Sequence, residues 1–185
     1  MRYDKDHKKA IRRKILELAA ARFRKEGLNN VGVASLMGDA GLTHGGFYSY
    51  FSSKETLIKE TLESSMNERF IGALLVIKKG GIDAFIHYYL CPEHRDHPEK
   101  GCPIAALAQE IGGHSIPIRK AYAKKVQGML AFIDSALPQP DPAKALAILA
   151  TLVGAMQLAR AVPDAKLSKQ ILAAAARTAC DIAHF

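Results

Sequence analysis

The sequence predicts an all-α fold, and three features of the chain support this. Apolar residues recur at three- and four-residue spacing through most of its length. Sustained period-two alternation is missing and β-branched residues do not cluster, so strands are not expected. Glycine and proline stand where the periodic segments stop. With 185 residues, 49% of them hydrophobic, the chain can bury a substantial core.

The N-terminal third predicts three helices. The first should run over His7–Glu26, with apolar side chains on one face and basic ones opposite, and Gly27 should end it with a positive φ. A short helix is expected over Val33–Ala40, where Gly41 permits a tight turn. A second short helix should begin after Thr43, its N-cap, and end near Tyr50 or Phe51.

A long helix is expected next. Ser52 or Ser53 should cap it, since Ser52 and Glu55 have the capping-box spacing. It should continue to about Lys78, where Gly80-Gly81 breaks it. Beyond the break the sequence predicts helices over 82–90, 103–112, 117–137, 143–161 and 168–183, with a polar loop over 91–101.

The last two predicted helices, 143–161 and 168–183, are apolar nearly all round. A terminal helix that is apolar on every face must be covered on every face. In a chain of this length the expected cover is a second copy, packed as a four-helix interface in a homodimer. The alternative is that a single chain buries both helices completely.

Positive charge is concentrated near the N-terminus. The formal net charge is +8, and residues 1–25 hold ten Lys or Arg against three acidic residues, a net charge of +7. Such a patch favours a polyanionic partner. The alternative is a solvated helix face.

The sequence also predicts a cytoplasmic protein without a membrane span. The basic N-terminus is not followed by the apolar stretch of a secretory signal, and the longest apolar run, Ala145–Met156, is too short to cross a bilayer. Three cysteines, an odd number, do not suggest a disulfide framework.

The segment Leu42–Lys54, LTHGGFYSYFSSK, is predicted to contact DNA. Two short helices joined by a glycine-containing turn, behind a basic helix, are typical of a helix-turn-helix. Phe47 and Phe51 should anchor the second helix; the alternative, that the whole aromatic run is core, leaves the basic helix unexplained. The residues assigned to base reading are Thr43, His44, Gly45, Gly46 and Ser49, and those assigned to phosphates are Tyr48, Tyr50 and Lys54.

The run VASLMGDAGLTHGGFYSYFSSKETLIKETL resembles the N-terminal domain of the TetR family of bacterial repressors. The shared pattern is Ala-Gly-(Val/Leu)-(Ser/Thr), a small residue, Phe-Tyr-x-(His/Tyr)-Phe and a following Lys, and it covers about Ile11 to Leu62. Ser35-Leu36-Met37-Gly38 departs from the family's Ile-Ala pair, so the supporting helix should pack differently. The family positions that touch DNA correspond to Thr43, His44, Gly45, Tyr48, Tyr50 and Lys54.

The resemblance implies about nine helices in two domains. Residues 1–53 would form a three-helix, helix-turn-helix DNA-binding domain, and residues 54–185 a larger helical domain for regulation, effector binding and dimerisation. The segment LCPEHRDHPEKGCPIAALAQEI is similar to a TetR branch with a Gly-Cys-(Pro/Leu) motif, some members of which respond to electrophiles, oxidants or small aromatic compounds. Cys102 is therefore a candidate thiol sensor at a helix N-terminus, where the dipole favours thiolate; alternatively it is a small buried apolar residue.

Two further sites follow from the second half of the chain. Cys91, His94, His97 and Cys102 are competent zinc ligands, but two prolines restrict their loop and the spacing lacks paired knuckles, so no metal is expected. An effector pocket suited to an apolar or electrophilic compound is expected between the later helices, although each candidate residue could equally be plain core. The candidates are Phe70, Leu74, Tyr88, Leu107, Ile111, Phe132, Met156 and Gln157.

Together these features predict a ligand- or redox-responsive regulator, a repressor that binds a near-palindromic, double-stranded operator as a homodimer. One alternative is a small all-α enzyme using His94, His97 or Cys102. The chain lacks a recognisable acid–base pair, phosphate loop or nucleophile motif, so neither an enzyme nor a cofactor is expected. The other is an architectural DNA binder without an effector, which would not need so large a second domain.

Overall fold

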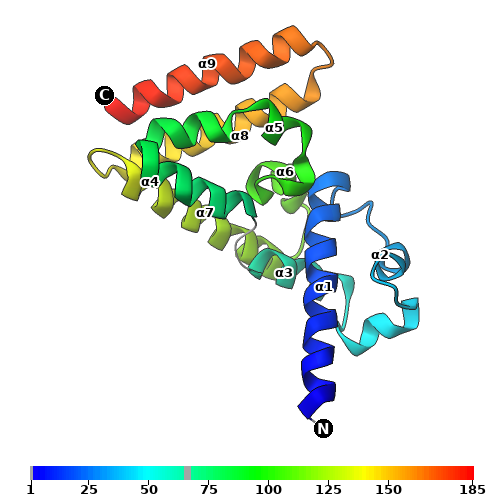
Figure 1. The fold of residues 1–185 in the computed structure, drawn as a ribbon. Helices are drawn as coiled ribbons and strands as arrows, with labels where there is room; N and C mark the ends of the chain where they lie inside the picture. The colour runs from blue at the N-terminus through cyan, green and yellow to red at the C-terminus, as the bar shows by residue number, and fades with distance from the viewer. Residues whose placement is uncertain (1, 65–67) are drawn as a thin grey trace.

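The structure is a computed structural model that describes residues 2–64 and 68–185. This part of the chain contains nine α-helices, two 3₁₀ helices and no strand, so the predicted all-α fold is confirmed (Figure 1). The elements are α1 (Arg2–Glu26), α2 (Val33–Asp39), η1 (His44–Ser49), α3 (Lys54–Glu63), α4 (Glu68–Tyr89), α5 (Pro92–Asp96), η2 (Pro98–Lys100), α6 (Pro103–Ile111), α7 (Ile116–Ala136), α8 (Pro142–Ala161) and α9 (Ala165–His184).

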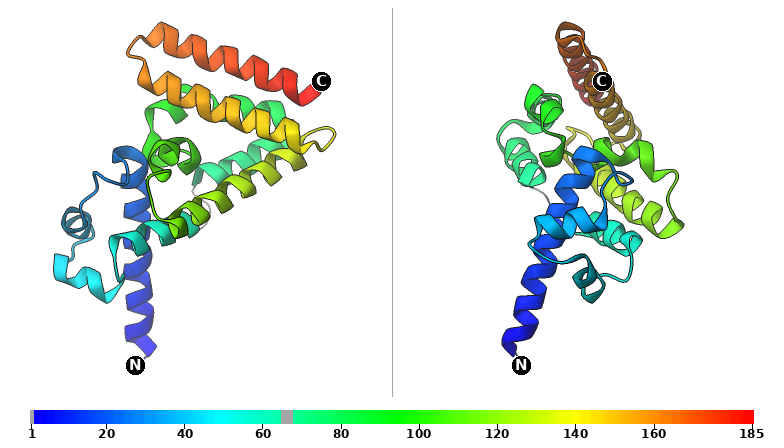
Figure 2. Two further views of the ribbon diagram at one scale, coloured as in Figure 1. Left: turned by 180° about the vertical axis from the view of Figure 1, so that it is seen from behind. Right: turned by 90° about the vertical axis from the view of Figure 1, so that its right-hand side faces the viewer.

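The helices form two units. The N-terminal unit consists of α1, α2, η1 and α3; the C-terminal unit consists of α4 to α9 with η2. Figures 1 and 2 show α2 and η1 beside α1 at one end of the molecule, and α8 and α9 side by side at the opposite edge. The first turns of α1 project beyond the other helices, and residues 6–10 within them are exposed.

Several helix ends lie where the sequence places them. Gly27 and Gly41 adopt φ values of 87° and 77°, a conformation that glycine adopts without steric cost. Ser53 is the N-cap of α3 and accepts a hydrogen bond from the backbone N–H of Thr56 at 3.1 Å. The predicted Ser52–Glu55 capping box is therefore wrong, because Ser53 occupies the cap.

The prediction of one long helix to Lys78 is also wrong. The helix ends at Glu63, and Ser64 leaves the helical region with ψ of 138°. The hydroxyls of Thr61 and Ser64 donate to backbone carbonyls at 2.7 and 2.8 Å, and such side-chain bonds compete with helix continuation. Further along, the predicted break at Gly80-Gly81 is confirmed, because Gly81 leaves the helical region (φ 69°, ψ −160°) and divides α4 into two helical parts.

The predicted loop over 91–101 contains two short helical segments, α5 and η2. Pro92 and Pro98 occupy first-turn positions in them, where a missing N–H costs nothing and the fixed φ favours a helical turn. Both prolines therefore start helical turns here, whereas the sequence analysis took them only as a restriction on the loop.

The two units share a packed interface. The buried cluster of the N-terminal unit contains Phe23, Phe47 and Phe51, and it continues into α6 and α7 through Leu107 and Ile118. The cluster of the C-terminal unit is centred on α8, whose Ile148, Leu152 and Met156 side chains are fully buried. By length and composition alone α8 could cross a membrane, contrary to the sequence prediction, but a core helix passes the same test.

Candidate nucleic-acid interface and cavity

The second helix of the helix-turn-helix is the 3₁₀ helix η1. Its N-cap Thr43 accepts a hydrogen bond from the backbone N–H of Gly46 at 3.3 Å. The rings of Phe47 and Phe51 are buried and stacked, with centroids 5.6 Å apart. As the sequence predicts, these two rings fix η1 to the core of the N-terminal unit.

The opposite side of η1 faces solvent. Thr43, His44, Gly45, Tyr48 and Ser49 are exposed, and the Tyr48 side chain is 66% exposed. Tyr48 packs edge-to-face against both His44 and Phe47, with centroids 6.2 and 5.4 Å apart. An exposed polar edge on a rigid aromatic base is the geometry that a reading helix requires.

Two predicted phosphate contacts, Tyr50 and Lys54, are less free than the sequence suggests. Tyr50 is half-buried and packs on the N-terminal core, and the Lys8 ammonium lies 5.8 Å from its ring centroid. The Lys54 Nζ atom donates to the carbonyl of Asn29 at 3.3 Å. Gly46 is also half-buried, and a Cβ added to it would be in contact with Thr43 and Met37. Tertiary packing, which the sequence pattern does not encode, holds these residues.

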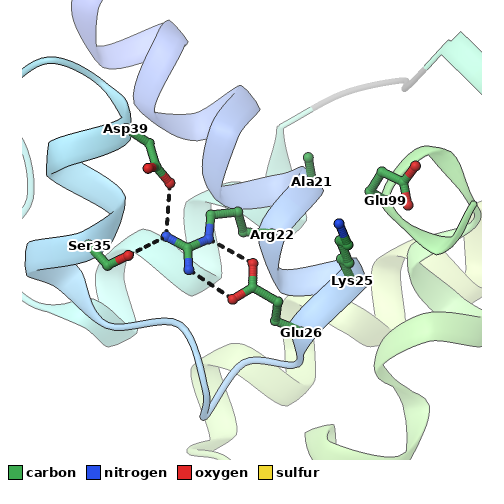
Figure 3. A pocket seen from close by; sticks show the side chains of 7 residues that line it. All are labelled: Ala21, Arg22, Lys25, Glu26, Ser35, Asp39 and Glu99. Atoms are coloured by element: carbon green, nitrogen blue, oxygen red, sulfur yellow. Dashed lines mark hydrogen bonds and ion pairs between the residues drawn. The ribbon is translucent and has the colours of Figure 1, made fainter.

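An ion-pair cluster of Arg22, Glu26, Ser35 and Asp39 ties α2 to α1 (Figure 3). The Arg22 guanidinium donates to Glu26 twice at 2.8 Å, to Asp39 at 2.9 Å and to Ser35 at 2.8 Å. The hydrogen bond from Arg22 lowers the pKa of Glu26, and its charge lowers it further. Sequence analysis missed this cluster, since its members lie on two helices whose relative orientation the sequence does not show.

Cys102 is the N-cap of α6 and its side chain is buried. Its backbone N–H donates to Nε2 of His94 at 3.0 Å, and Nδ1 of His94 lies 2.7 Å from the carbonyl oxygen of Tyr89. Since Nε2 accepts, Nδ1 carries the proton and donates to that carbonyl. Both nitrogens of the fully buried His94 ring thus bind backbone and leave no lone pair for zinc. Among the described residues, no three His, Cys, Asp or Glu side chains form a metal-binding group.

Residues 15–61, which include this helix-turn-helix, match the sequence model of a family described as bacterial regulatory proteins, tetR family. The helix-turn-helix segment of this chain is therefore similar in sequence to that of the TetR family. A curated relative, the uncharacterized HTH-type transcriptional regulator YfiR of Bacillus subtilis (strain 168), is 31% identical over 64 residues. Those residues make up 35% of this chain and 31% of the relative, so the match spans about a third of each. The family and this relative are transcriptional regulators and not enzymes.

Solved structures resemble the chain over nearly its whole length. The reduced form of NemR from E. coli gives a TM-score of 0.73 at 21% identity and covers 93% of this chain and 96% of its own. A TetR-family regulator from Agrobacterium tumefaciens gives 0.75 at 20% identity, with 92% and 98% covered. One from Chloroflexus aurantiacus J-10-FL gives 0.74 at 24% identity, with 93% and 95% covered. At these identities the likeness shows the fold alone.

A partly open cavity of about 1240 Å³ lies between the two units of this fold. The walls come from α1, α3, α4, η2, α6 and α7, and Cys102 is part of them. Of the eight predicted pocket residues, Tyr88 and Leu107 line this cavity, and Phe70 lies where the structure describes no side chain.

The other five predicted pocket residues, Leu74, Ile111, Phe132, Met156 and Gln157, do not line the cavity. Phe132 packs edge-to-face on Phe85 with centroids 5.2 Å apart, and Gln157 donates to the carbonyl of Ala105 at 3.2 Å. Met156 and Ile111 are buried in the two core clusters, and Leu74 is largely exposed. Helical periodicity indicates that a residue faces inward, but not whether it meets a neighbour or a void.

Several polar residues of the cavity wall were not predicted, among them Arg24, Tyr89 and Lys125. In the sequence, Arg24 and Lys125 look like the other Lys and Arg residues of their helices. No residue spacing distinguishes them as pocket residues. Tyr89 reads as an ordinary member of an apolar helix. Only the packing of α1, α4 and α7 brings them to one space.

Proposed function

We propose that this TetR-family regulator is a repressor that binds a near-palindromic, double-stranded operator as a homodimer in the cytoplasm. The observation that carries the proposal is the exposed polar edge of η1, held rigidly by the buried Phe47–Phe51 stack. The basic, projecting start of α1 lies in the same unit and supplies the charge that phosphate binding requires.

Within this edge, His44 and Ser49 are positioned to read bases together with the small residues Thr43, Gly45 and Gly46. The small side chains let the backbone of η1 approach the floor of the major groove. Tyr48, Tyr50 and Lys54 would hold phosphates; Tyr48 is the most accessible of them. Phosphate contacts fix the register of the protein, and base contacts select the sequence.

The homodimer would form through α8 and α9. Leu146 and Leu158 on α8 are 56% and 59% exposed, and Leu167 on α9 is also exposed. α9 buries one face, which contains Leu172 and Ala176, so a single chain does not cover both helices on every side. Their position at the molecular edge, far from η1, would leave two recognition helices free to face successive major grooves.

The regulatory input would reach the cavity between the units. A small-molecule effector there, or modification of Cys102 in its wall, would favour one relative arrangement of the units over another. The shared apolar interface through Leu107 and Ile118 provides the mechanical connection to the N-terminal core. An architectural DNA-binding protein without an effector would not need this cavity.

The DNA-binding proposal is tested by selecting ligands for the full chain from a random double-stranded DNA pool. We expect an inverted repeat with half-site centres about one helical turn apart. Fluorescence anisotropy with the selected DNA should then show affinity that falls steeply with salt. Binding without sequence preference, or a selected site without symmetry, would contradict the proposal.

Thiol sensing is tested with Cys102→Ser and with Cys91→Ser and Cys180→Ser as controls. Burial and the nearby Asp83 raise the pKa of Cys180 to about 11, which disfavours its reactive thiolate. We expect N-ethylmaleimide to release the selected DNA from the wild type and from both controls, but not from Cys102→Ser. Equal release from all four proteins would exclude Cys102 as the sensor.

A further inference from the structure

The cavity between the units has an apolar wall and a cationic one. Apolar side chains from five helices line most of it, among them Leu16, Ile58, Phe85, Leu107 and Met129. Arg24 of α1 and Lys125 of α7 also reach it, and both are half-buried. A wall of this kind differs from the uncharged pocket that the sequence alone suggests.

Arg24 and Lys125 are satisfied only by backbone oxygens. Nε and a terminal nitrogen of Arg24 donate to the carbonyl of Glu99, the first at 2.8 Å, and Nζ of Lys125 donates to the carbonyl of Ser64 at 2.9 Å. Within the described ranges neither makes an ion pair with a carboxylate. A cation taken out of water is normally paired with an anion, so a counter-charge is expected here.

The carboxylates of the cavity wall do not supply that charge. Glu17 pairs with Arg13 at 2.7 Å, Glu63 lies 3.7 Å from Lys59, and Glu99 lies 3.3 Å from Nδ1 of His97. Each acidic group thus makes its ion pair with a basic group other than Arg24 or Lys125, although the charge of Glu99 also acts on Arg24. Arg24 and Lys125 are thus the half-buried cations that the cavity offers to a ligand, beside the exposed Lys100 and Lys124.

A third polar group in the wall is also unsatisfied. The Tyr89 side chain is 3% exposed and its hydroxyl has no hydrogen-bond partner of standard geometry; the Cys102 thiol is the polar group beside it. Burial raises the pKa of Tyr89 well above its usual value, so the hydroxyl keeps its proton and can donate. Burial lowers the pKa of Lys125, and Arg24, Tyr89, Lys125 and Cys102 all line the same cavity.

We propose that the cavity binds an amphipathic monoanion, a carboxylate with an alkyl or aromatic body, whose head group is held by Arg24 and Lys125. The Tyr89 hydroxyl would donate a third hydrogen bond, and the body would lie along the apolar wall. This inference rests on the effector site of the proposed function and names its ligand class. A cationic ligand would be repelled, and a neutral one would leave both cations unpaired.

The same two cations connect the units, which gives the ligand a route to the DNA-binding end. Arg24 belongs to the N-terminal unit and bonds η2 of the C-terminal unit; Lys125 belongs to α7 and bonds Ser64 at the end of α3. A carboxylate forms charge-assisted hydrogen bonds about twice as strong as those to a carbonyl. Anion binding therefore exchanges the inter-unit hydrogen bonds of Arg24 and Lys125 for bonds to the ligand and loosens the attachment of α1 and α3 to the C-terminal unit.

The proposal is tested by isothermal titration calorimetry on the reduced full chain, with two matched series of probes. Octanoate is compared with 1-octanol and octyltrimethylammonium, and 2-naphthoate with 2-naphthol. At least one anion should bind about tenfold or more tightly than its neutral counterpart, a ratio worth about 1.4 kcal/mol. If octanoate does so, the ligand has an alkyl body; if 2-naphthoate does so, it has an aromatic body. If neither anion exceeds its neutral partner, the proposal is overturned.

Variants locate the anion site. Arg24→Gln and Lys125→Gln should each remove most of the anion preference while leaving 1-octanol or 2-naphthol affinity unchanged, and Arg24→Lys should retain part of it. Lys124→Gln is the control, because Lys124 lines the same cavity but is exposed. If Lys124→Gln loses as much preference as Lys125→Gln, the assignment is wrong. Circular dichroism melts verify that each variant folds.

These measurements contain no DNA, so they can succeed or fail independently of operator binding. Adding the preferred anion to the chain on its selected DNA then tests the coupling. Wild type should release DNA and Arg24→Gln should not. Anion binding without release would refute the exchange of inter-unit bonds while leaving both the ligand class and the DNA-binding proposal standing.

Discussion

The imidazole of His94 accepts a hydrogen bond from the backbone N–H of Cys102, eight residues later, at 3.0 Å. This bond closes the α5–η2 segment onto the start of α6 and fixes Cys102 in the cavity wall. The ring also lies so close to Gly101 that a Cβ there would be 2.8 Å from it. The candidate sensor is thus held by a histidine that the sequence suggests as a metal ligand.

Replacing His94 by Ala should destabilise the chain by about 2–4 kcal/mol, because it leaves a buried N–H unpaired and opens a void. Urea unfolding followed by circular dichroism measures the loss. His97→Ala is the control, since its half-exposed ring should change stability by less than about 0.5 kcal/mol. Equal losses in the two variants would show that the His94 hydrogen bonds do not hold the fold.

Gly27→Ala should cost more than about 1 kcal/mol, because φ there is 87° and a Cβ would lie 2.4 Å from a carboxylate oxygen of Glu110. The matched control is Gly112→Ala, at a helical φ of −58° with no atom within 4 Å of the new Cβ. Thermal melts should show a clear loss for the first variant and none for the second. If both variants melt at the wild-type temperature, the backbone at Gly27 does not impose the expected strain on Ala.

The Arg22 cluster predicts a specific acid sensitivity. Because Arg22 lowers the pKa of Glu26 below its ordinary 4.5, the ion pair stabilises the fold above that value and the stabilisation is lost as pH falls through the lowered pKa. Urea midpoints measured from pH 6 to pH 3 should fall more steeply in wild type than in Arg22→Gln. Parallel curves for wild type and Arg22→Gln would mean that the Arg22–Glu26 ion pair makes no measurable contribution to the stability of the fold.

The roles along η1 predict different effects on DNA binding. His44→Ala should change the preferred bases, at about 1–3 kcal/mol for a lost base contact. Tyr48→Phe and Lys54→Ala should weaken all sequences evenly, and Lys54→Ala should lower the salt slope by about one. Competition binding of the selected site and single-base variants separates the two patterns. Unchanged affinity in all three variants would remove the assignment of the site.

The proposed dimer predicts that Leu158→Glu produces a monomer, because it would place a charge within an apolar interface. Analytical ultracentrifugation at micromolar concentration measures the change. Leu75→Glu is the control, since Leu75 is 57% exposed on α4 and lies outside the proposed interface. A dimeric Leu158→Glu protein would place the interface elsewhere.

Local chemistry explains which predictions from the sequence succeeded. Gly27, Gly41 and Ser53 end or begin helices through their own backbone and side-chain preferences, and the four-residue spacing of Phe47 and Phe51 is enough to bury both. The prediction of one long helix failed at Ser64, because hydrogen bonds from the Thr61 and Ser64 hydroxyls to backbone carbonyls compete with helix hydrogen bonds. The spacing of apolar residues does not reveal this competition.

By itself, the sequence determined the all-α class, the helix-turn-helix and the exposed polar edge of η1, because each depends on contacts within a few residues. The Arg22 cluster, the His94 brace and the meeting of Arg24, Tyr89 and Lys125 in the wall of one cavity were decided only by the tertiary structure. These groups come from helices far apart in the chain, and a hydrogen bond or a cavity between them exists only once packing has set the helices' distances and rotations.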